Sequence, residues 1–166
     1  MTNIREELCR LIRRNDDEQW VFSNIALQQL QERCPKNLIP GLIDCLQDGH
    51  PDVRRLAIEV LAEARAESAI PAIMERLSDD DWVVQVVVVY HIRFFGPSAA
   101  GAIPYVEPWL ESPNEYLRLL AARAILALDA RRTDLLPQIW DALTSDIPCA
   151  RYEARVFFGL EPADDS

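Results

Sequence analysis

Apolar and polar positions along this chain repeat at an interval of slightly more than thirty residues. The clearest marker is an isoleucine or leucine followed by proline, which occurs as Ile39-Pro40, Ile70-Pro71, Ile103-Pro104 and Leu136-Pro137. A fixed period in this range is typical of proteins built by stacking one small structural unit on the next. The pattern therefore predicts a repeat architecture before any single residue is interpreted.

The positions that follow each proline agree from repeat to repeat and describe two helices. A leucine follows the proline by six residues, and a short polar residue of the kind that ends or caps a helix follows it by eight. From the thirteenth residue onward, apolar residues recur with the spacing of one helical face. We expect a first helix that starts at the proline and a second helix that starts near Pro51, Asp81, Asn114 and Ile147.

One segment of the second repeat argues against a helix when it is taken alone. Residues 86–89 are four consecutive valines, and β-branched residues favour strands. We nevertheless expect a helix, because the corresponding positions of the other repeats carry helical patterns and intrinsic propensity is the weaker signal.

The repeats organise the chain as one domain with an irregular start and a short tail. Residues 1–36 form an N-terminal capping repeat, in which 4–12 and 21–30 carry two apolar stripes without an Ile-Pro pair. In the last repeat Glu153 and Glu161 replace apolar residues, so we expect that face to lack a following repeat. The regular repeats are 37–67, 68–100, 101–132 and 133–161, and residues 162–166 are expected to be a frayed tail.

The composition argues against several classes of protein. The formal net charge is −10, which disfavours a nucleic-acid partner because such binding depends on Lys and Arg side chains. The spacing of the four cysteines fits neither a disulfide framework nor a zinc site. The N-terminus lacks the apolar stretch of a signal peptide, and the longest apolar run, residues 86–90, is too short to span a bilayer. We therefore expect a cytoplasmic protein that binds neither nucleic acid nor membrane.

Two segments carry a resemblance to a known family. Residues 52–61 have the pattern Val-Arg-x-x-Ala-x-x-x-Leu, and residues 117–126 repeat it with Leu117-Arg118 and Ala121. These segments resemble HEAT repeats, in particular the short variety found in bilin lyases and bacterial scaffold proteins. The resemblance covers roughly residues 37–160. It implies an all-α fold, a right-handed α-solenoid of about five helical hairpins.

The resemblance also implies a ladder of arginine and aspartate side chains between repeats. A planar guanidinium suits this role because it can hold a carboxylate with two hydrogen bonds. In this chain Gln85 replaces one arginine of the column, and Ser112 and Ser145 replace two aspartates. We therefore expect a partial ladder, carried by Arg54, Arg118, Arg151, Asp48 and Asp79.

The resemblance further implies that the second helices line a concave surface. Their outward positions are apolar with tyrosine and arginine interspersed, a mixture that is typical of protein interfaces. The alternative is that tight curvature buries this stripe inside the monomer. The predicted partner-binding residues are Val86, Val89, Tyr90, Arg93, Leu119, Arg123, Tyr152 and Arg155.

The tryptophans are interpreted from their neighbours in the pattern. Trp20, Trp109 and Trp140 fall within apolar helical stripes and are expected in the core. Trp82 follows a run of aspartates at the start of a helix, where an exposed anchor and a packing role are both open.

No catalytic constellation stands out in the sequence. Only two histidines are present, His50 in a turn and His91 in an apolar column, and no phosphate-binding or nucleophile motif occurs. The run Asp79-Asp80-Asp81 lacks the glycine and the distal glutamate of a calcium loop. We therefore predict no catalytic residue, no cofactor and no metal site.

The leading functional hypothesis from the sequence is a non-enzymatic scaffold or regulator. Its partner would be another protein, a basic one where charge steers association, or a second copy of the chain. The first alternative is a bilin lyase-like or chaperone-like subunit, which would need a partner subunit and a tetrapyrrole pocket. The second is a HEAT-like DNA-binding or glycosylase-type protein, which the acidic charge disfavours although Arg93, Arg123 and Arg155 could form a basic strip.

Overall fold

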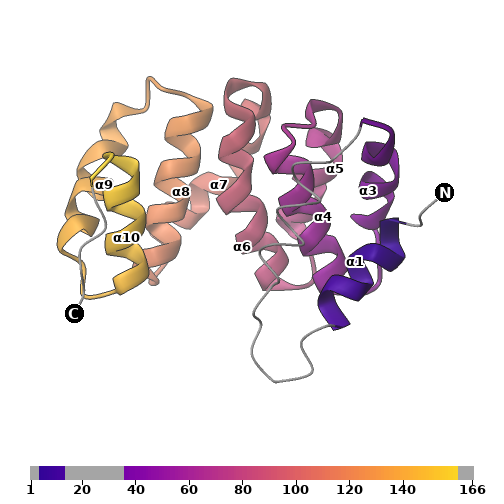
Figure 1. The fold of residues 1–166 in the computed structure, drawn as a ribbon. Helices are drawn as coiled ribbons and strands as arrows, with labels where there is room; N and C mark the ends of the chain where they lie inside the picture. Colours follow the sequence, from indigo (N-terminus) through magenta and orange to yellow (C-terminus); the bar gives the residue numbers. More distant parts are fainter. Residues whose placement is uncertain (1–3, 14–35, 161–166) are drawn as a thin grey trace. The chain divides into compact units, whose positions relative to one another are not determined.

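A computed structural model of the chain describes residues 4–13 and 36–160. These residues form helices and no strand, and the helices are arranged as repeated hairpins (Figure 1). The predicted fold class, an all-α solenoid, is therefore confirmed. The chain divides into an N-terminal body, Met1–Phe95, and a C-terminal body, Gly96–Ser166.

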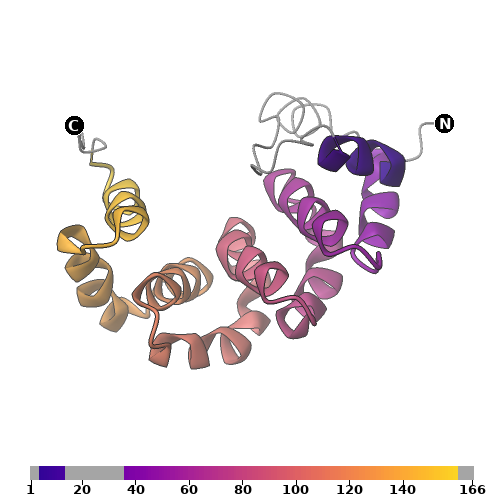
Figure 2. The same cartoon turned by 90° about the horizontal axis from the view of Figure 1, so that it is seen from below.

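The N-terminal body contains two hairpins preceded by one helix. Its second helices, α4 and α6, pack side by side in one layer, and the first helices form another (Figure 2). The leading helix α1 packs against α3 and α4. The elements are α1 (Ile4–Arg13), η1 (Lys36–Leu38), α3 (Ile39–Cys45), α4 (Pro51–Glu63), η2 (Glu67–Ala69), α5 (Ile70–Glu75), η3 (Arg76–Ser78) and α6 (Trp82–His91).

The C-terminal body contains two further hairpins. Their second helices, α8 and α10, are again in contact with each other. The connection from α6 is η4 (Ile92–Ala102), a 3-10 segment that is broken at Gly96. The remaining elements are α7 (Ile103–Val106), η5 (Glu107–Glu111), α8 (Glu115–Leu128), η6 (Thr133–Leu135), α9 (Leu136–Asp141), η7 (Ala142–Thr144) and α10 (Pro148–Phe157).

The helix starts agree with those that the sequence predicts. The prolines of the four Ile-Pro and Leu-Pro pairs all lie in the first turn of a first helix. Proline is tolerated there because the first N–H groups of a helix have no hydrogen-bond partner within the helix, so its missing N–H costs nothing. The side chain of Asp81 caps α6 by accepting hydrogen bonds from Val83 N and Val84 N, and Asn114 caps α8 in the same way. The valines 86–89 lie within α6, so the helical prediction for them is confirmed.

In each hairpin of the described residues, one hydrogen bond closes the turn between the two helices. The residue fourteen positions after the repeat proline donates to the backbone carbonyl of the residue eight positions after it. Arg54 Nη1 donates to Asp48 O over 2.8 Å, and Gln85 Nε2 donates to Asp79 O over 2.6 Å. The same bond is made by Arg118 to Ser112 O and by Arg151 to Ser145 O.

The ladder between repeats is partial, as predicted. Arg54 holds Asp79 of the next repeat with two bonds, Nε to Oδ2 over 2.9 Å and Nη2 to Oδ1 over 2.5 Å. Both side chains are buried, at 7% and 0% exposure. The third and fourth repeats have serine at the aspartate position, and a serine hydroxyl cannot neutralise the charge of a guanidinium.

The helix α1 occupies the place of a preceding second helix. Arg5 forms a two-bond ion pair with Asp48, which repeats the geometry of Arg54 with Asp79 one hairpin earlier. The approach of α1 to α3 is close, because a Cβ built on Gly41 would lie 2.9 Å from Ile4 Cγ2. The second stripe of the predicted capping repeat, in residues 21–30, lies outside the described residues, as do Trp20 and Cys34.

One stretch, Trp82–Glu111, is long and apolar enough to cross a membrane by length and composition alone. It is not one continuous helix, because Gly96 adopts φ 54°, ψ −144° and Pro97 follows it. The apolar residues of this stretch belong to successive helices of two hairpins.

The structure corrects two interpretations of side chains in the last repeat. Glu153 is buried and forms an ion pair with Arg123 of α8, so it faces the preceding repeat and gives no sign of an open side. Whether a repeat follows is not tested, and Glu161 lies outside the described residues. Trp140 is 62% exposed and contacts Phe158 at the surface, whereas the sequence pattern predicts a core position. The first helices are too short for a 3.6-residue stripe to separate their buried side from their exposed side.

Candidate functional site: a cavity at the start of two helices

The predicted partner-binding residues of the N-terminal body all lie on or just after α6. Val89 is buried, and Val86, Tyr90 and Arg93 are half-buried. The guanidinium of Arg93 lies over the ring of Tyr90, with its carbon 3.9 Å from the ring centre, and donates a hydrogen bond to Tyr90 O over 2.9 Å. The structure therefore brings Tyr90 and Arg93 together and places Val89 in the core.

The predicted residues of the C-terminal body divide in the same way. Leu119 and Arg123 are buried, and Arg123 is paired with Glu153 of α10. Arg155 is half-buried, and Tyr152 is exposed. The stripe is thus partly covered by the neighbouring helix of the same chain, and the partner surface stays a prediction for its accessible members.

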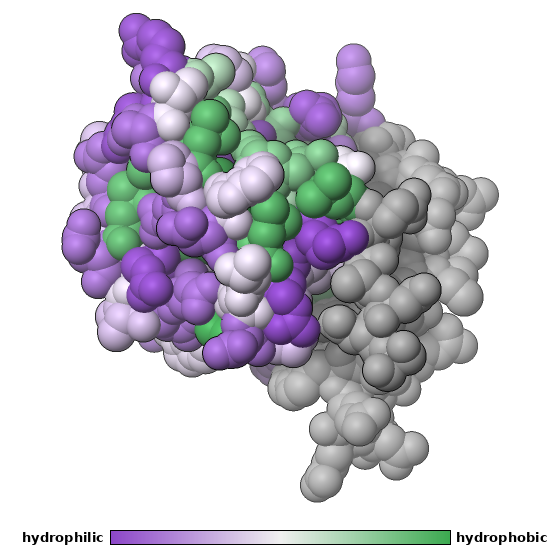
Figure 3. All heavy atoms as spheres, turned by 90° about the vertical axis from the view of Figure 1, so that its left-hand side faces the viewer, coloured by the Kyte–Doolittle hydropathy of each residue, from purple (hydrophilic) through white to green (hydrophobic). Residues whose placement is uncertain are grey.

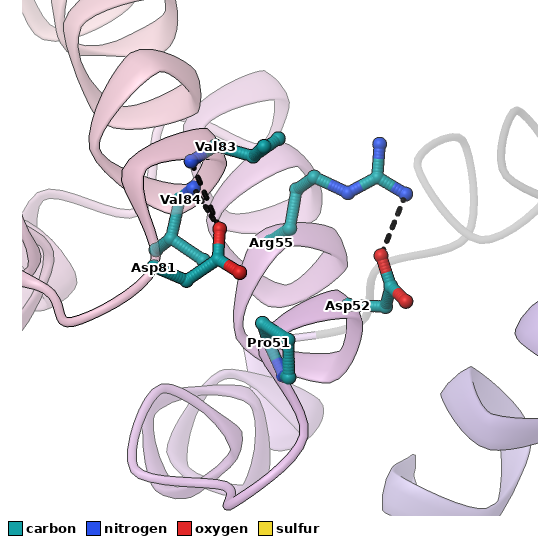
Figure 4. Close-up of a pocket in the computed structure, with 6 residues that line it drawn as sticks. All are labelled: Pro51, Asp52, Arg55, Asp81, Val83 and Val84. Atoms are coloured by element: carbon teal, nitrogen blue, oxygen red, sulfur yellow. Dashed lines mark hydrogen bonds and ion pairs between the residues drawn. The ribbon is translucent and has the colours of Figure 1, made fainter.

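A cavity of about 400 Å³ opens between the N-terminal ends of α4 and α6 (Figure 4). Pro51, Asp52 and Arg55 come from the first turns of α4. The other wall contains Asp81, Val83 and Val84 from the start of α6. The lining therefore combines apolar groups with one guanidinium and two carboxyl groups.

Local capping fixes the charged groups of this cavity. His50 caps α4, because its Nδ1 accepts a hydrogen bond from Asp52 N over 3.2 Å. Arg55 Nη2 then lies 3.3 Å from Asp52 Oδ1, one helical turn earlier (Figure 4). On the opposite wall the carboxylate of Asp81 is held by its bonds to Val83 N and Val84 N, 2.9 and 3.3 Å long.

Two titratable groups further along α4 and α6 have shifted pKa values. Burial raises the pKa of Glu59, and the nearby Arg55 guanidinium, 3.9 Å away, offsets part of that rise. Burial lowers the pKa of His91 to about 4, although the hydrogen bond between its Nδ1 and Val87 O acts in the opposite direction. The imidazole of His91 is therefore neutral at neutral pH.

This lining suits a ligand that is largely apolar and carries acidic and N–H groups. The volume falls within the range of roughly 300–1,000 Å³ that is usual for small-molecule sites. Arg55 offers hydrogen bonds to a carboxylate, and the carboxyl groups of Asp52 and Asp81 can accept N–H donors. Among the described residues, no group of three or more His, Cys, Asp or Glu side chains is placed to hold a metal ion.

A second cavity, of about 430 Å³, lies in the C-terminal body. Glu115, Asp134 and Asp141 line it, with Arg118 as the cation. The guanidinium of Arg118 already donates to Ser112 O and Pro113 O. This cavity is the more acidic of the two and fits an acidic, apolar ligand less well.

The sequence pattern missed the cavity between α4 and α6, although a signal for it was present. Arg55 lies fifteen residues after Pro40, the same position that marks Val86, Leu119 and Tyr152 in the later repeats. In the sequence, Asp81 indicates only where the second helix of its repeat starts. Neither residue alone predicts a hollow, because the cavity depends on the distance between two helices.

Comparison with known protein families finds the same type of repeat that the sequence resembles. The family model for HEAT repeats matches residues 6–93 and 39–125. The chain is 29% identical over 107 residues to the bilin biosynthesis protein RpcF of Synechococcus sp. (strain WH8020), and the match covers 54% of this chain and 51% of that protein. The chain thus spans about half the length of this curated relative.

A solved structure has a similar fold. It is the complex of CpcE and CpcF of phycocyanin lyase from Nostoc sp. PCC7120, one chain of which matches with a TM-score of 0.65 and 22% sequence identity. The match covers 90% of the present chain and 61% of that chain. These relatives correct the leading functional hypothesis: a non-enzymatic scaffold is wrong, and the bilin lyase-like alternative is favoured in its place.

Proposed function

This chain belongs to the HEAT-repeat family, and we propose that it is a bilin lyase-like subunit that acts together with a second HEAT-type subunit. The observation that carries the proposal is the sequence similarity to the bilin biosynthesis protein RpcF. The likeness in fold to a chain of the CpcE–CpcF complex is consistent with a two-subunit arrangement. The ligand in this proposal is an open-chain tetrapyrrole, and the working compartment is the cytoplasm.

The cavity between α4 and α6 supports the proposal by its chemistry. A bilin is a flat, mostly apolar conjugated molecule with propionate carboxylates at its edge and pyrrole N–H donors along its centre. The valines 83 and 84 and Pro51 offer apolar contact to such a molecule. Arg55 matches a propionate, and Asp81 matches a pyrrole N–H. The cavity holds a part of the tetrapyrrole, and the second subunit covers the rest.

The residues of the cavity would bind and orient the bilin. Arg55 is held by Asp52 and Glu59 at 3.3 and 3.9 Å, so its guanidinium is positioned before a ligand arrives. The fixed carboxylate of Asp81 limits rotation of the bound pyrrole. Glu59, whose pKa is raised by burial, stands one turn behind Arg55 and responds to the charge of the bound propionate.

Bilin binding is tested by titrating a bilin into the purified chain, alone and with the second HEAT-type subunit, while the visible absorption band is recorded. We expect the band to shift and sharpen on binding. The Arg55→Gln variant should weaken binding about tenfold or more, because a hydrogen bond to a charged group contributes about 1.5–3 kcal/mol.

Arg131→Gln is the matched control, since the Arg131 side chain is 90% exposed and, among the described residues, forms its ion pair with the neighbouring Asp129. It should bind bilin as the wild type does. Absence of any spectral shift with the wild-type chain and the second subunit would refute the proposed function. If the Arg55 and Arg131 variants bind bilin equally well, the chain binds bilin, but at a place other than the cavity between α4 and α6.

A further inference from the structure

The guanidinium of Arg55 faces two carboxylates of its own helix before any ligand arrives. Asp52 Oδ1 lies 3.3 Å from its Nη2, and Glu59 Oε1 lies 3.9 Å from its Nη1. All three side chains are largely withdrawn from solvent, with exposed fractions of 16% for Asp52, 14% for Glu59 and 13% for Arg55. When all three are ionised, the cluster therefore holds one more negative charge than positive.

A ligand propionate adds another carboxylate to the same guanidinium. Asp81, on the opposite wall of the cavity, contributes a further negative charge to the space that the ligand enters. Like charges that are brought together in a mostly buried site repel strongly, because little solvent lies between them. The cavity therefore accepts a propionate most readily if one of its own carboxylates takes up a proton at the same time.

Of the three carboxyl groups, Glu59 is the one best placed to take up that proton. Asp52 lies in the first turn of α4, where the helix dipole favours a negative charge. The carboxylate of Asp81 is already bound by two backbone N–H groups of α6. Glu59 lies about two turns further along α4, where burial raises its pKa and the carboxylate of Glu63 adds to that rise.

Three helices pack against α4, namely α1, α3 and α6. From α6 come Tyr90 and His91, and the imidazole of His91 stays neutral because burial, with Arg55 acting in the same direction, lowers its pKa to about 4. The titratable side chains described on α1 and α3 are Arg5, Glu6, Cys9, Asp44 and Cys45. Among the described residues, the charges that act on Glu59 are those of Arg55 and Glu63.

We propose that the cavity takes up a proton together with the bilin, and that Glu59 holds this proton beside the bound propionate. The inference rests on the proposed function, because the propionate belongs to the bilin. Glu59 is then a positioning residue that acts through Arg55, since its protonation leaves the guanidinium to Asp52 and the ligand.

The sign of the pH dependence follows from this arrangement. A bound propionate raises the pKa of Glu59 further, because it adds a negative charge and draws on the same guanidinium. Affinity is therefore highest where Glu59 is protonated in both states. It falls as the pH rises through the interval between the pKa of Glu59 in the free chain and its higher pKa in the complex.

The test measures the dissociation constant of biliverdin, a bilin with two free propionates, between about pH 5 and about pH 8. The second HEAT-type subunit is present, and calorimetry in two buffers of different ionisation enthalpy gives the proton uptake. We expect the affinity of the wild type to fall by up to about tenfold per pH unit. The Glu59→Gln variant, which mimics the protonated acid, should match the wild type at low pH and bind about tenfold more tightly at high pH. The titration of biliverdin itself is common to both proteins and cancels in the comparison.

Asp146→Asn is the matched control, since it removes one carboxylate from an exposed position of the C-terminal body. Asp146 precedes α10, and Figure 3 looks onto the side of the molecule where α9 and α10 lie and shows many polar groups there. This variant should keep the pH dependence of the wild type. The dimethyl ester of biliverdin is a second control, because without a carboxylate it should bind without the fall in affinity at high pH.

The outcomes separate this inference from the proposed function. The same pH dependence in the wild type and in Glu59→Gln would overturn the inference, and so would the same pH dependence for biliverdin and its ester. If circular dichroism shows that Glu59→Gln does not fold, the ester comparison decides alone. Binding of biliverdin with one affinity at every pH would remove the proton and leave the proposed function standing, whereas absence of binding at every pH would sink both.

Discussion

Replacing Arg54 by alanine is expected to lower the free energy of unfolding by about 3 kcal/mol. The guanidinium bonds Asp79 twice, over 2.9 and 2.5 Å, and also donates to Asp48 O and to Asp80 Oδ1. Its removal leaves the Asp79 carboxylate fully buried without its main counter-charge. That loss is larger than the loss of the hydrogen bonds alone, because a buried charge without a partner keeps its full desolvation cost.

The magnitude sits at the lower end of the range for breaking a buried ion pair, which is about 3–5 kcal/mol. Asp79 keeps a bond from Asp81 N over 3.0 Å, and Arg76 Nη1 lies 3.5 Å from its other oxygen. These contacts compensate part of the lost charge. For a domain of this size, 3 kcal/mol corresponds to a melting temperature lowered by about 6–12 °C.

The assay is thermal and urea unfolding followed by far-ultraviolet circular dichroism. Arg118→Ala is the matched control, because Arg118 holds the same position in its repeat, bonds Ser112 O over 2.7 Å and forms no ion pair with a carboxylate of the described residues. This substitution should lower the free energy of unfolding by only about 1–2 kcal/mol. Adding Asp79→Ala to Arg54→Ala should recover part of the loss, since the uncompensated charge is then removed.

Dependence on pH gives a second check of the same pair. Burial acts to raise the pKa of Asp79, but the bonds from Arg54 and Asp81 N outweigh it and hold the pKa below its usual range. The folded state therefore binds this proton less readily than the unfolded state does. The stabilisation is complete above about pH 4 and is lost as the pH falls below it. Equal destabilisation by Arg54→Ala and Arg118→Ala at neutral pH would refute the reasoning.

Three further predictions concern other parts of the chain. Gly41→Ala should cost about 1–3 kcal/mol in urea unfolding, because its new Cβ would lie 2.9 Å from Ile4 Cγ2, and a variant as stable as the wild type would contradict the packing of α1. His91 should titrate near pH 4 in a nuclear magnetic resonance experiment, so its contribution to stability is complete above pH 6.5 and is lost as the pH falls toward 4; titration at 6.5 would show that it is not buried. Cys149 should react rapidly with iodoacetamide, whereas Cys45, whose pKa burial raises to about 11, should not; peptide mapping decides between them.

The hairpins could be predicted from the sequence because their signals are local. A proline in a first turn and a capping residue such as Asp81 or Asn114 each act on the nearest backbone, whatever the rest of the fold does. The helical state of residues 86–89 needed a comparison with the other repeats, since four valines alone favour a strand. The partial ladder followed from which positions carry a carboxylate.

The accessibility of the second helices could not be predicted in the same way. Val89, Leu119 and Arg123 look like outward positions on a helical wheel, yet each is buried in the folded chain. A helical wheel describes one helix, whereas the burial of its side chains depends on how much of its surface the neighbouring helix covers. The apparent outlier Glu153 has the same origin, because its partner Arg123 belongs to another repeat.

The cavity was missed for a related reason. Arg55 and Asp81 are twenty-six positions apart and belong to different repeats, so no motif of fixed spacing links them. The hollow lies between the first turns of α4 and α6, two helices that pack side by side. The distance between α4 and α6 depends on how the two whole hairpins pack against each other.

The hydrogen bond from the fourteenth residue of each repeat to its own turn has a consequence for assembly and for evolution. Donor and acceptor are six residues apart, so each hairpin can reach its native turn without waiting for a distant part of the chain. Folding can then nucleate in any of these hairpins and spread to its neighbours. A gene that gains or loses one such segment still encodes hairpins that close by themselves, which allows lineages of these proteins to change length without losing the ability to fold.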